Sequence, residues 1–87
     1  MKKYYEENKN IYKTIQVTRR ISFLLLEEQG NLELTQKQMA QRLDMPLQTY
    51  KRLSSSKNTS NITMENLAKI FENSSISPSD VFDGIYN

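Results

Sequence analysis

The chain has 87 residues, with 12 Lys or Arg, 10 Asp or Glu, and neither Cys nor His. This length allows one small domain with a single core. The lack of Cys excludes disulfides and thiolate zinc sites, and the lack of His removes the commonest general base and metal ligand. We therefore expect no enzyme activity, no cofactor and no metal. The longest apolar run, residues 23–26, is too short to cross a bilayer, and no signal peptide is apparent, so we expect a cytoplasmic protein without membrane contact.

The charges are distributed unevenly along the chain. Residues 1–57 carry a net charge of +5, whereas residues 58–87 carry −3. A positive half suits a polyanionic partner such as nucleic acid. Ordinary surface scatter would give a similar count, so the charge alone does not decide between the two interpretations.

The first expected element is a helix over residues 11–28. Asn10 is placed to cap its start, and Gly30 is placed to close it in the left-handed conformation. Residues 1–10 are polar and form either a disordered arm or further turns of this helix. The helix is predicted from apolar residues that recur at helical spacing: Ile11, Ile15, Ile21, Leu24 and Leu25.

Four consecutive apolar residues, 23–26, lie within this helix. They cannot all face one side of it. Either other helices surround this segment, or Phe23 and Leu26 are offered to a partner chain. A homodimer is therefore an open alternative, with core packing expected for most of these residues.

Two shorter helices are expected over residues 36–43 and 47–54, joined by a tight turn. Thr35 and Gln38 have the spacing of a capping box, in which each side chain accepts the other's backbone N–H. Asp44 stands where the turn needs a residue at positive φ, and Pro46 suits the first position of the next helix. We expect the inward residues to be Met39, Ala40, Leu43, Tyr50 and Leu53, and the outward residues of the second helix to be Leu47, Gln48, Thr49, Lys51 and Arg52.

A polar loop, residues 54–61, separates this pair from two last helices. Thr63 is expected to cap the fourth helix, and Ser77 to cap a short fifth one with Pro78 at its first position and Gly84 after its end. The expected apolar face of the fourth helix is Leu67, Ala68, Ile70 and Phe71. The fold class predicted is all-α, with five helices, an extended first helix and no strand.

Residues 35–53, TQKQMAQRLDMPLQTYKRL, resemble the helix-turn-helix of the Cro and phage-repressor type, the xenobiotic-response-element family. Residues 62–70, ITMENLAKI, and 76–82, ISPSDVF, are similar to later segments of the same family. The resemblance covers about residues 21–82. It implies a lambda-repressor-like DNA-binding domain over residues 11–87, with residues 1–10 as an arm or a helix extension, and a protein of bacterial, phage or plasmid origin.

The resemblance also implies a set of DNA contacts. Gln36, at the start of the second helix, would bond a phosphate, and residues 47–49 would face base edges in the major groove, with Gln48 able to bind adenine through two hydrogen bonds. Arg52 would reach a guanine or a phosphate, and Lys57 with its neighbours would hold the other strand's phosphates. The DNA-binding residues predicted are Gln36, Lys37, Leu47, Gln48, Thr49, Lys51, Arg52, Lys57, Asn58 and Thr59.

The chain departs from the family pattern at three positions. Asp44 replaces the glycine of the turn, and Pro46 replaces a Ser or Thr that caps the recognition helix. Ser54 replaces a Glu that pairs, in relatives, with an Arg of the first helix, where this chain aligns Leu24 or Leu25. The expected function is a dimeric, sequence-specific regulator on a palindromic operator; the alternative is a protein-interaction module, an antirepressor or inhibitor, that uses the surface at Pro46 and Leu47 on a protein partner.

Overall fold

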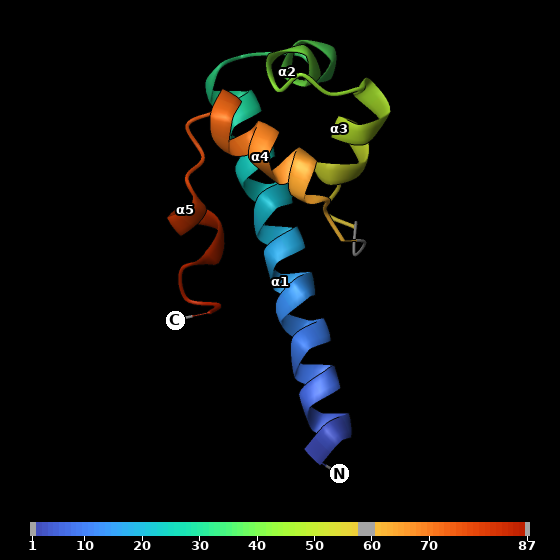
Figure 1. The fold of residues 1–87 in the computed structure, drawn as a ribbon. Coiled ribbons are helices and arrows are strands. Elements are labelled where there is room, and N and C mark those ends of the chain that lie inside the picture. Colours follow the sequence, from blue (N-terminus) through green and yellow to red (C-terminus); the bar gives the residue numbers. More distant parts are fainter. Residues whose placement is uncertain (1, 58–60, 87) are drawn as a thin grey trace.

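The computed structural model describes residues 2–57 and 61–86, with side chains from residue 12 onward. Within these residues the chain forms five helices and no strand (Figure 1). The prediction of an all-α fold is confirmed. The helices are α1 (Lys2–Asn31), α2 (Gln36–Arg42), α3 (Leu47–Leu53), α4 (Met64–Asn73) and α5 (Pro78–Phe82). As far as the described residues extend, no helix is long and apolar enough to cross a membrane.

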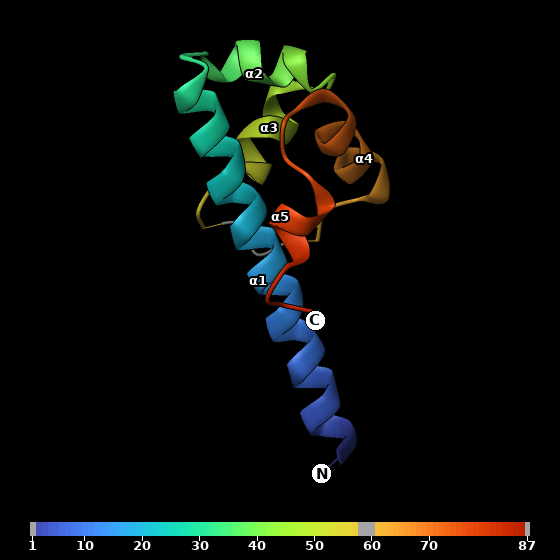
Figure 2. The ribbon, with the colours of Figure 1, turned by 90° about the vertical axis from the view of Figure 1, so that its left-hand side faces the viewer.

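The long first helix sets the shape of the molecule. At 1.5 Å per residue its 30 residues span about 45 Å, close to the 47 Å length of the whole chain. The C-terminal half of α1 lies among the other helices, whereas its N-terminal half projects away from them (Figures 1 and 2). The backbone of residues 2–10 therefore continues the helix.

The predicted stop of the first helix is wrong. Gly30 lies inside α1, and the residue at positive φ is Glu33, with a φ of 55°. The Glu33 N–H donates to the Gly30 carbonyl (3.1 Å) and the Leu34 N–H to the Gln29 carbonyl (3.0 Å). These two bonds form a Schellman motif, which satisfies the carbonyls of Gln29 and Gly30. The left-handed residue that closes the helix is therefore Glu33, three positions after the glycine.

The turn between α2 and α3 has the predicted conformation. Thr35 and Gln38 form the expected capping box at the start of α2. Asp44 adopts a φ of 57°, and the N–H of Met45 donates to the Ala40 carbonyl at 3.0 Å, a second Schellman motif. Pro46 is the N-cap residue, one position before the place predicted for it, and it provides no side-chain cap to α3.

The last two helices begin at the predicted caps. Thr63 accepts the Asn66 N–H, and Ser77 forms a capping box with Asp80. Gly84 follows α5 with a φ of 79°, as expected. One prediction for α4 is wrong: Ala68 is exposed, because the buried side of this helix is centred on Leu67 and Ile70.

One core joins the helices, and α1 contributes to it through residues spaced three or four apart. Ala40, buried at the α2–α3 crossing, is small enough to let these two helices approach closely. The buried apolar side chains are Val17, Ile21, Leu25, Met39, Ala40, Leu43, Met45, Tyr50, Leu53, Leu67, Ile70, Ile76, Val81 and Ile85.

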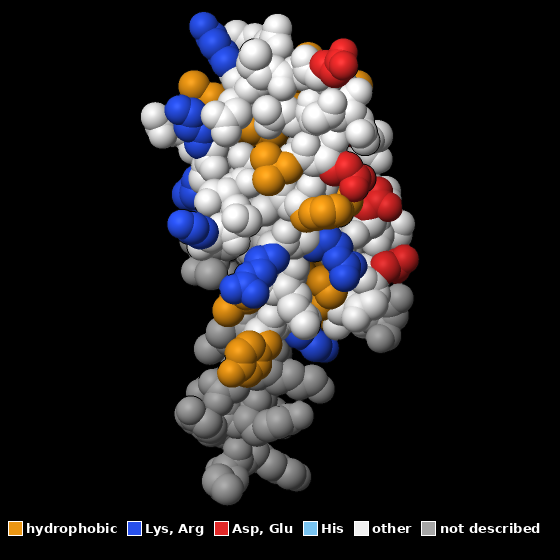
Figure 3. Space-filling model, turned by 180° about the vertical axis from the view of Figure 1, so that it is seen from behind, with side chains coloured by type: hydrophobic (Ala, Val, Ile, Leu, Met, Phe, Trp, Pro, Cys, Tyr) orange, Lys and Arg blue, Asp and Glu red, His pale blue; other side chains and the backbone are white. Residues whose placement is uncertain are grey.

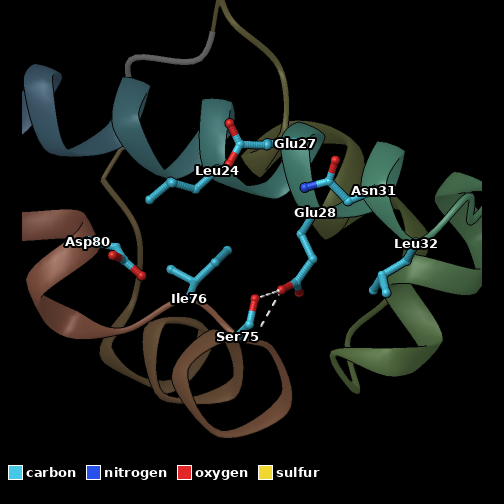
Figure 4. Close-up of a pocket in the computed structure, with 8 residues that line it drawn as sticks. All are labelled: Leu24, Glu27, Glu28, Asn31, Leu32, Ser75, Ile76 and Asp80. Atoms are coloured by element: carbon cyan, nitrogen blue, oxygen red, sulfur yellow. Dashed lines mark hydrogen bonds between the residues drawn. The ribbon is translucent and has the colours of Figure 1, made fainter.

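A buried carboxylate ties α1 to the segment between α4 and α5. Glu28 is only 7% exposed, and its Oε1 accepts both the hydroxyl and the backbone N–H of Ser75, the latter at 2.9 Å (Figure 4). Its Oε2 has no hydrogen-bond partner among the described residues. A hollow of about 230 Å³ opens beside this contact. The carboxylate therefore holds the α4–α5 connection against α1 over 47 residues of chain.

Glu28→Ala should lower the free energy of unfolding by about 1–2 kcal/mol, because Ser75 loses a charged acceptor for two donors. Urea unfolding followed by circular dichroism measures the change. Glu72→Ala is the matched control, since Glu72 is an exposed glutamate on α4 and its loss should cost less than about 0.5 kcal/mol. Equal effects of the two substitutions would show that the contact between Glu28 and Ser75 does not stabilise the fold.

Candidate nucleic-acid interface

The α2–turn–α3 unit, residues 36–53, lies at the end of the molecule opposite the N-terminus (Figure 1). α2 packs mainly on α3, and α3 packs in turn on α1. The inward residues predicted for this unit are all buried. The position of α3 therefore depends on its contacts with α1.

Tyr50 is the largest of these anchors. Its side chain is fully buried, and its hydroxyl donates to Oε1 of Gln29 on α1 at 2.6 Å. Burial disfavours the phenolate and raises the pKa of Tyr50 to about 12, with the nearby charge of Glu28 acting in the same direction. The phenol is thus neutral and fixed, and it holds the middle of α3 to α1.

Ser22 is a second anchor, and the sequence analysis missed it. Its hydroxyl donates to the Leu53 carbonyl, the last of α3, at 2.7 Å, and the Ser55 and Thr18 carbonyls are alternative acceptors for the same proton at 3.0 and 3.1 Å. Ser22, and not Leu24 or Leu25, therefore faces the segment around Ser54. The sequence feature that could have identified this anchor is a serine between Ile21 and Leu25, on the inward and otherwise largely apolar side of α1.

Ser54 is itself buried and makes a local bond. Its Oγ donates to the Tyr50 carbonyl at 2.8 Å, one turn earlier in the helix. A serine in this place needs no charged partner on α1, so the first helix buries no arginine here. The two serines, Ser22 and Ser54, thus satisfy the polar groups at this end of α3.

Most of the predicted DNA-binding side chains point outward. Those that are exposed are Gln36, Lys37, Gln48, Lys51, Arg52 and Lys57. Leu47 and Thr49, also predicted to face outward, are half-buried, and Leu47 packs against the core, so these two are outward only in part. Asn58 and Thr59 lie outside the described residues.

This surface is basic. Between residues 35 and 57 the sequence has five Lys or Arg and a single acid, Asp44. Within the described residues, the cations Lys37, Lys51 and Lys57 take part in no ion pair. On the face shown in Figure 3, Lys and Arg side chains lie along one edge and across the lower middle, and Asp and Glu side chains lie along the opposite edge. The unit therefore presents unpaired positive charge to solvent.

Comparisons with protein-family models, with curated proteins and with solved structures returned no significant match.

Tyr50→Phe should test the anchor through its pH dependence. The folded-state pKa of about 12 lies above the ordinary 10.0, so the stabilising preference for the neutral phenol is complete below pH 10. It is lost as the pH rises from about 10 to about 12, because the unfolded chain releases its proton first. The wild type should lose about 2 kcal/mol over this interval that the phenylalanine variant does not lose.

Urea unfolding at about pH 8 and about pH 11 measures both effects, and about 1.4 kcal/mol of the pH-dependent loss should be present at about pH 11. Near pH 8 the variant should be less stable by about 1 kcal/mol, the value of the hydrogen bond to Gln29. Tyr12→Phe, at an exposed position, is the control and should follow the wild type at both pH values. Parallel losses of wild type and Tyr50→Phe with pH would contradict the assignment.

Proposed function

We propose that this chain is a sequence-specific DNA-binding regulator in which α2 and α3 form a helix-turn-helix of lambda-repressor-like arrangement. The observation that carries the proposal is the α2–turn–α3 unit itself. The unit is closed by Asp44 at positive φ, packed through Ala40, and polar and basic on its outward side. Such a unit needs a close crossing and a short left-handed turn, and its second helix must enter a major groove.

The outward side supplies chemistry suited to a duplex. Gln48 is exposed near the start of α3, where a glutamine amide can pair with adenine by two hydrogen bonds. Lys37, Lys51 and Lys57 are exposed cations that suit phosphates, and Arg52 suits a phosphate or a guanine. Gln36 is an additional phosphate donor. Base reading is thus assigned chiefly to Gln48, and positioning to the basic residues around it.

The half-burial of Leu47 limits the apolar surface that the start of α3 offers to DNA bases. A leucine that packs partly on the core leaves only part of its side chain for a thymine methyl. The same burial leaves less apolar surface for the alternative, a protein-interaction module that would dock through Pro46 and Leu47. Thr49, also half-buried, retains its methyl and hydroxyl as short-range contacts.

The proposal includes a homodimer on a palindromic site and a cytoplasmic location. A single α3 of seven residues reads only a few base pairs, and two copies related by a two-fold axis double the site. No enzymatic activity is part of the proposal.

Binding to a pool of duplex fragments at two salt concentrations tests the proposal. With four cations per chain, and so eight per dimer, on phosphates, affinity should fall roughly 10,000-fold between about 50 and about 200 mM salt, because each contact releases a condensed counterion. The pool should also become enriched in a shared site. Absence of binding at the lower salt concentration would refute DNA binding and leave the protein-interaction module.

Two substitutions separate base reading from phosphate contact. Gln48→Ala should reduce discrimination at one base pair of each half-site by about 1–3 kcal/mol, whereas Lys57→Ala should weaken all sequences alike and reduce the salt slope of the dimer by about 2. Lys69→Ala, which removes a lysine paired with Glu65 on α4, is the control and should change neither. Equal effects of Gln48→Ala on every sequence would refute the role given to Gln48.

A further inference from the structure

From residue 12 onward, one face of α1 is left uncovered by the other residues that the structure describes. We call it the α1 stripe. It lies on the side opposite the core, and all its members except Glu27 are spaced three or four residues apart. Phe23 at its centre is 63% exposed, and Leu26 is 44% exposed. The residues of the stripe, all exposed, are Tyr12, Gln16, Arg19, Phe23, Leu26, Glu27 and Gly30.

The spacing of the stripe is that of a helix-pairing seam. Positions 12, 16, 19, 23, 26 and 30 alternate steps of four and three, the a/d pattern of a helix that packs along another helix. This pattern is independent of the core, which uses Val17, Ile21 and Leu25 on the other side of α1. A large exposed aromatic in the middle of such a seam is a typical interface anchor.

The charges around Phe23 are ordered so that the stripe is complementary to itself. Arg19 and Arg20 lie one turn before Phe23, and Glu27 lies one turn after it. In a parallel pair the arginines of two chains would face each other, and so would the glutamates. In an antiparallel pair that crosses at Phe23, Glu27 of each chain faces the two arginines of the other. Opposite charges across such a seam favour that orientation and disfavour the parallel one.

The surface also leaves room for this contact. A hollow of about 370 Å³ lies beside Phe23 and is lined by Arg19 and Arg20 together with the chain after α5, at Gly84 and Ile85. Arg20 donates one guanidinium N–H to the Asp83 carbonyl, which holds this side chain at the hollow. An arginine has further donors, so Arg20 can also bind a carboxylate that enters from outside.

We propose that the α1 stripe binds a second copy of this chain, antiparallel and two-fold symmetric, with the two Phe23 side chains at the crossing. A two-fold interface requires a self-complementary patch, which the order of arginines, phenylalanine and glutamate provides. This pairing identifies the surface through which the proposed homodimer forms. It rests on the proposed function only in assigning the dimer to a palindromic DNA site.

Sedimentation equilibrium of the full chain without DNA tests the pairing. The wild type should be dimeric at micromolar concentrations, and Phe23→Glu should raise the dimer Kd at least ~100-fold, since each dimer loses two anchors. Met64→Glu is the control: Met64 is 81% exposed on α4, outside the stripe, and its substitution should leave the dimer intact. Both variants should keep the wild-type circular dichroism, because both sites are at the surface. The unfolding midpoint of Phe23→Glu should equal that of the wild type diluted below its dimer Kd, since dimerisation itself raises the midpoint.

The orientation is tested with cysteines, since the chain has none of its own. In the antiparallel pair Gln16 of one chain lies opposite Gly30 of the other, seven residues on either side of Phe23. Nothing lies within 4 Å of a Cβ placed on Gly30, so Gly30→Cys is sterically free. A mixture of Gln16→Cys and Gly30→Cys chains should form a disulfide-linked dimer on oxidation, and Gln16→Cys alone should not.

Three results would overturn the pairing: a monomeric wild type, a Phe23→Glu chain that still dimerises, or cross-linking of Gln16→Cys with itself. Each of these is measured without DNA and so leaves the DNA-binding proposal to its own test. If Phe23→Glu dissociates the dimer but the wild-type dimer binds no DNA, the proposed interface is supported and the proposed DNA-binding function is refuted.

Discussion

The attachment of α3 to α1 is the constraint on which the rest of the structure depends. A helix of seven residues is too short to be stable alone in water, so its position must come from its packing. Tyr50 fixes its middle through burial and the bond to Gln29, and Ser22 donates to its last carbonyl, that of Leu53. Because both partners lie on α1, the long helix determines the direction in which the outward side of α3 faces.

This attachment explains why the outward side of α3 can remain polar. The buried side already provides the stability, so exposed residues such as Gln48 and Lys51 are not needed for packing. The turn at Asp44 then sets α2 against α3 without a glycine, since aspartate tolerates the left-handed conformation at modest cost. A surface that recognises another macromolecule requires side chains that are held on a rigid support and are free to make contacts on the outside.

Local signals made much of this fold predictable. Caps at Thr35, Thr63 and Ser77 depend on neighbours within three residues, and the spacing of the buried residues follows the helical repeat. The failures depend on contacts distant in sequence or on choices between similar local options. The left-handed residue that ends α1 is Glu33 and not the predicted Gly30. Ser22 and Glu28 have partners that lie 31 and 47 positions further along the chain, so their roles could not be predicted from local sequence. The outward residues could be named in advance, but the half-burial of Leu47 could not.

Mapping amide chemical shifts of the isotopically labelled chain during titration with duplex DNA at low salt tests the central claim most directly. The DNA-binding account predicts that the largest changes fall in residues 36–37, 47–52 and 57, with little change in α5. It also predicts that added salt reverses them. Changes concentrated on the α1 stripe or on α5, or no change in α2 and α3 at saturating DNA, would contradict the account.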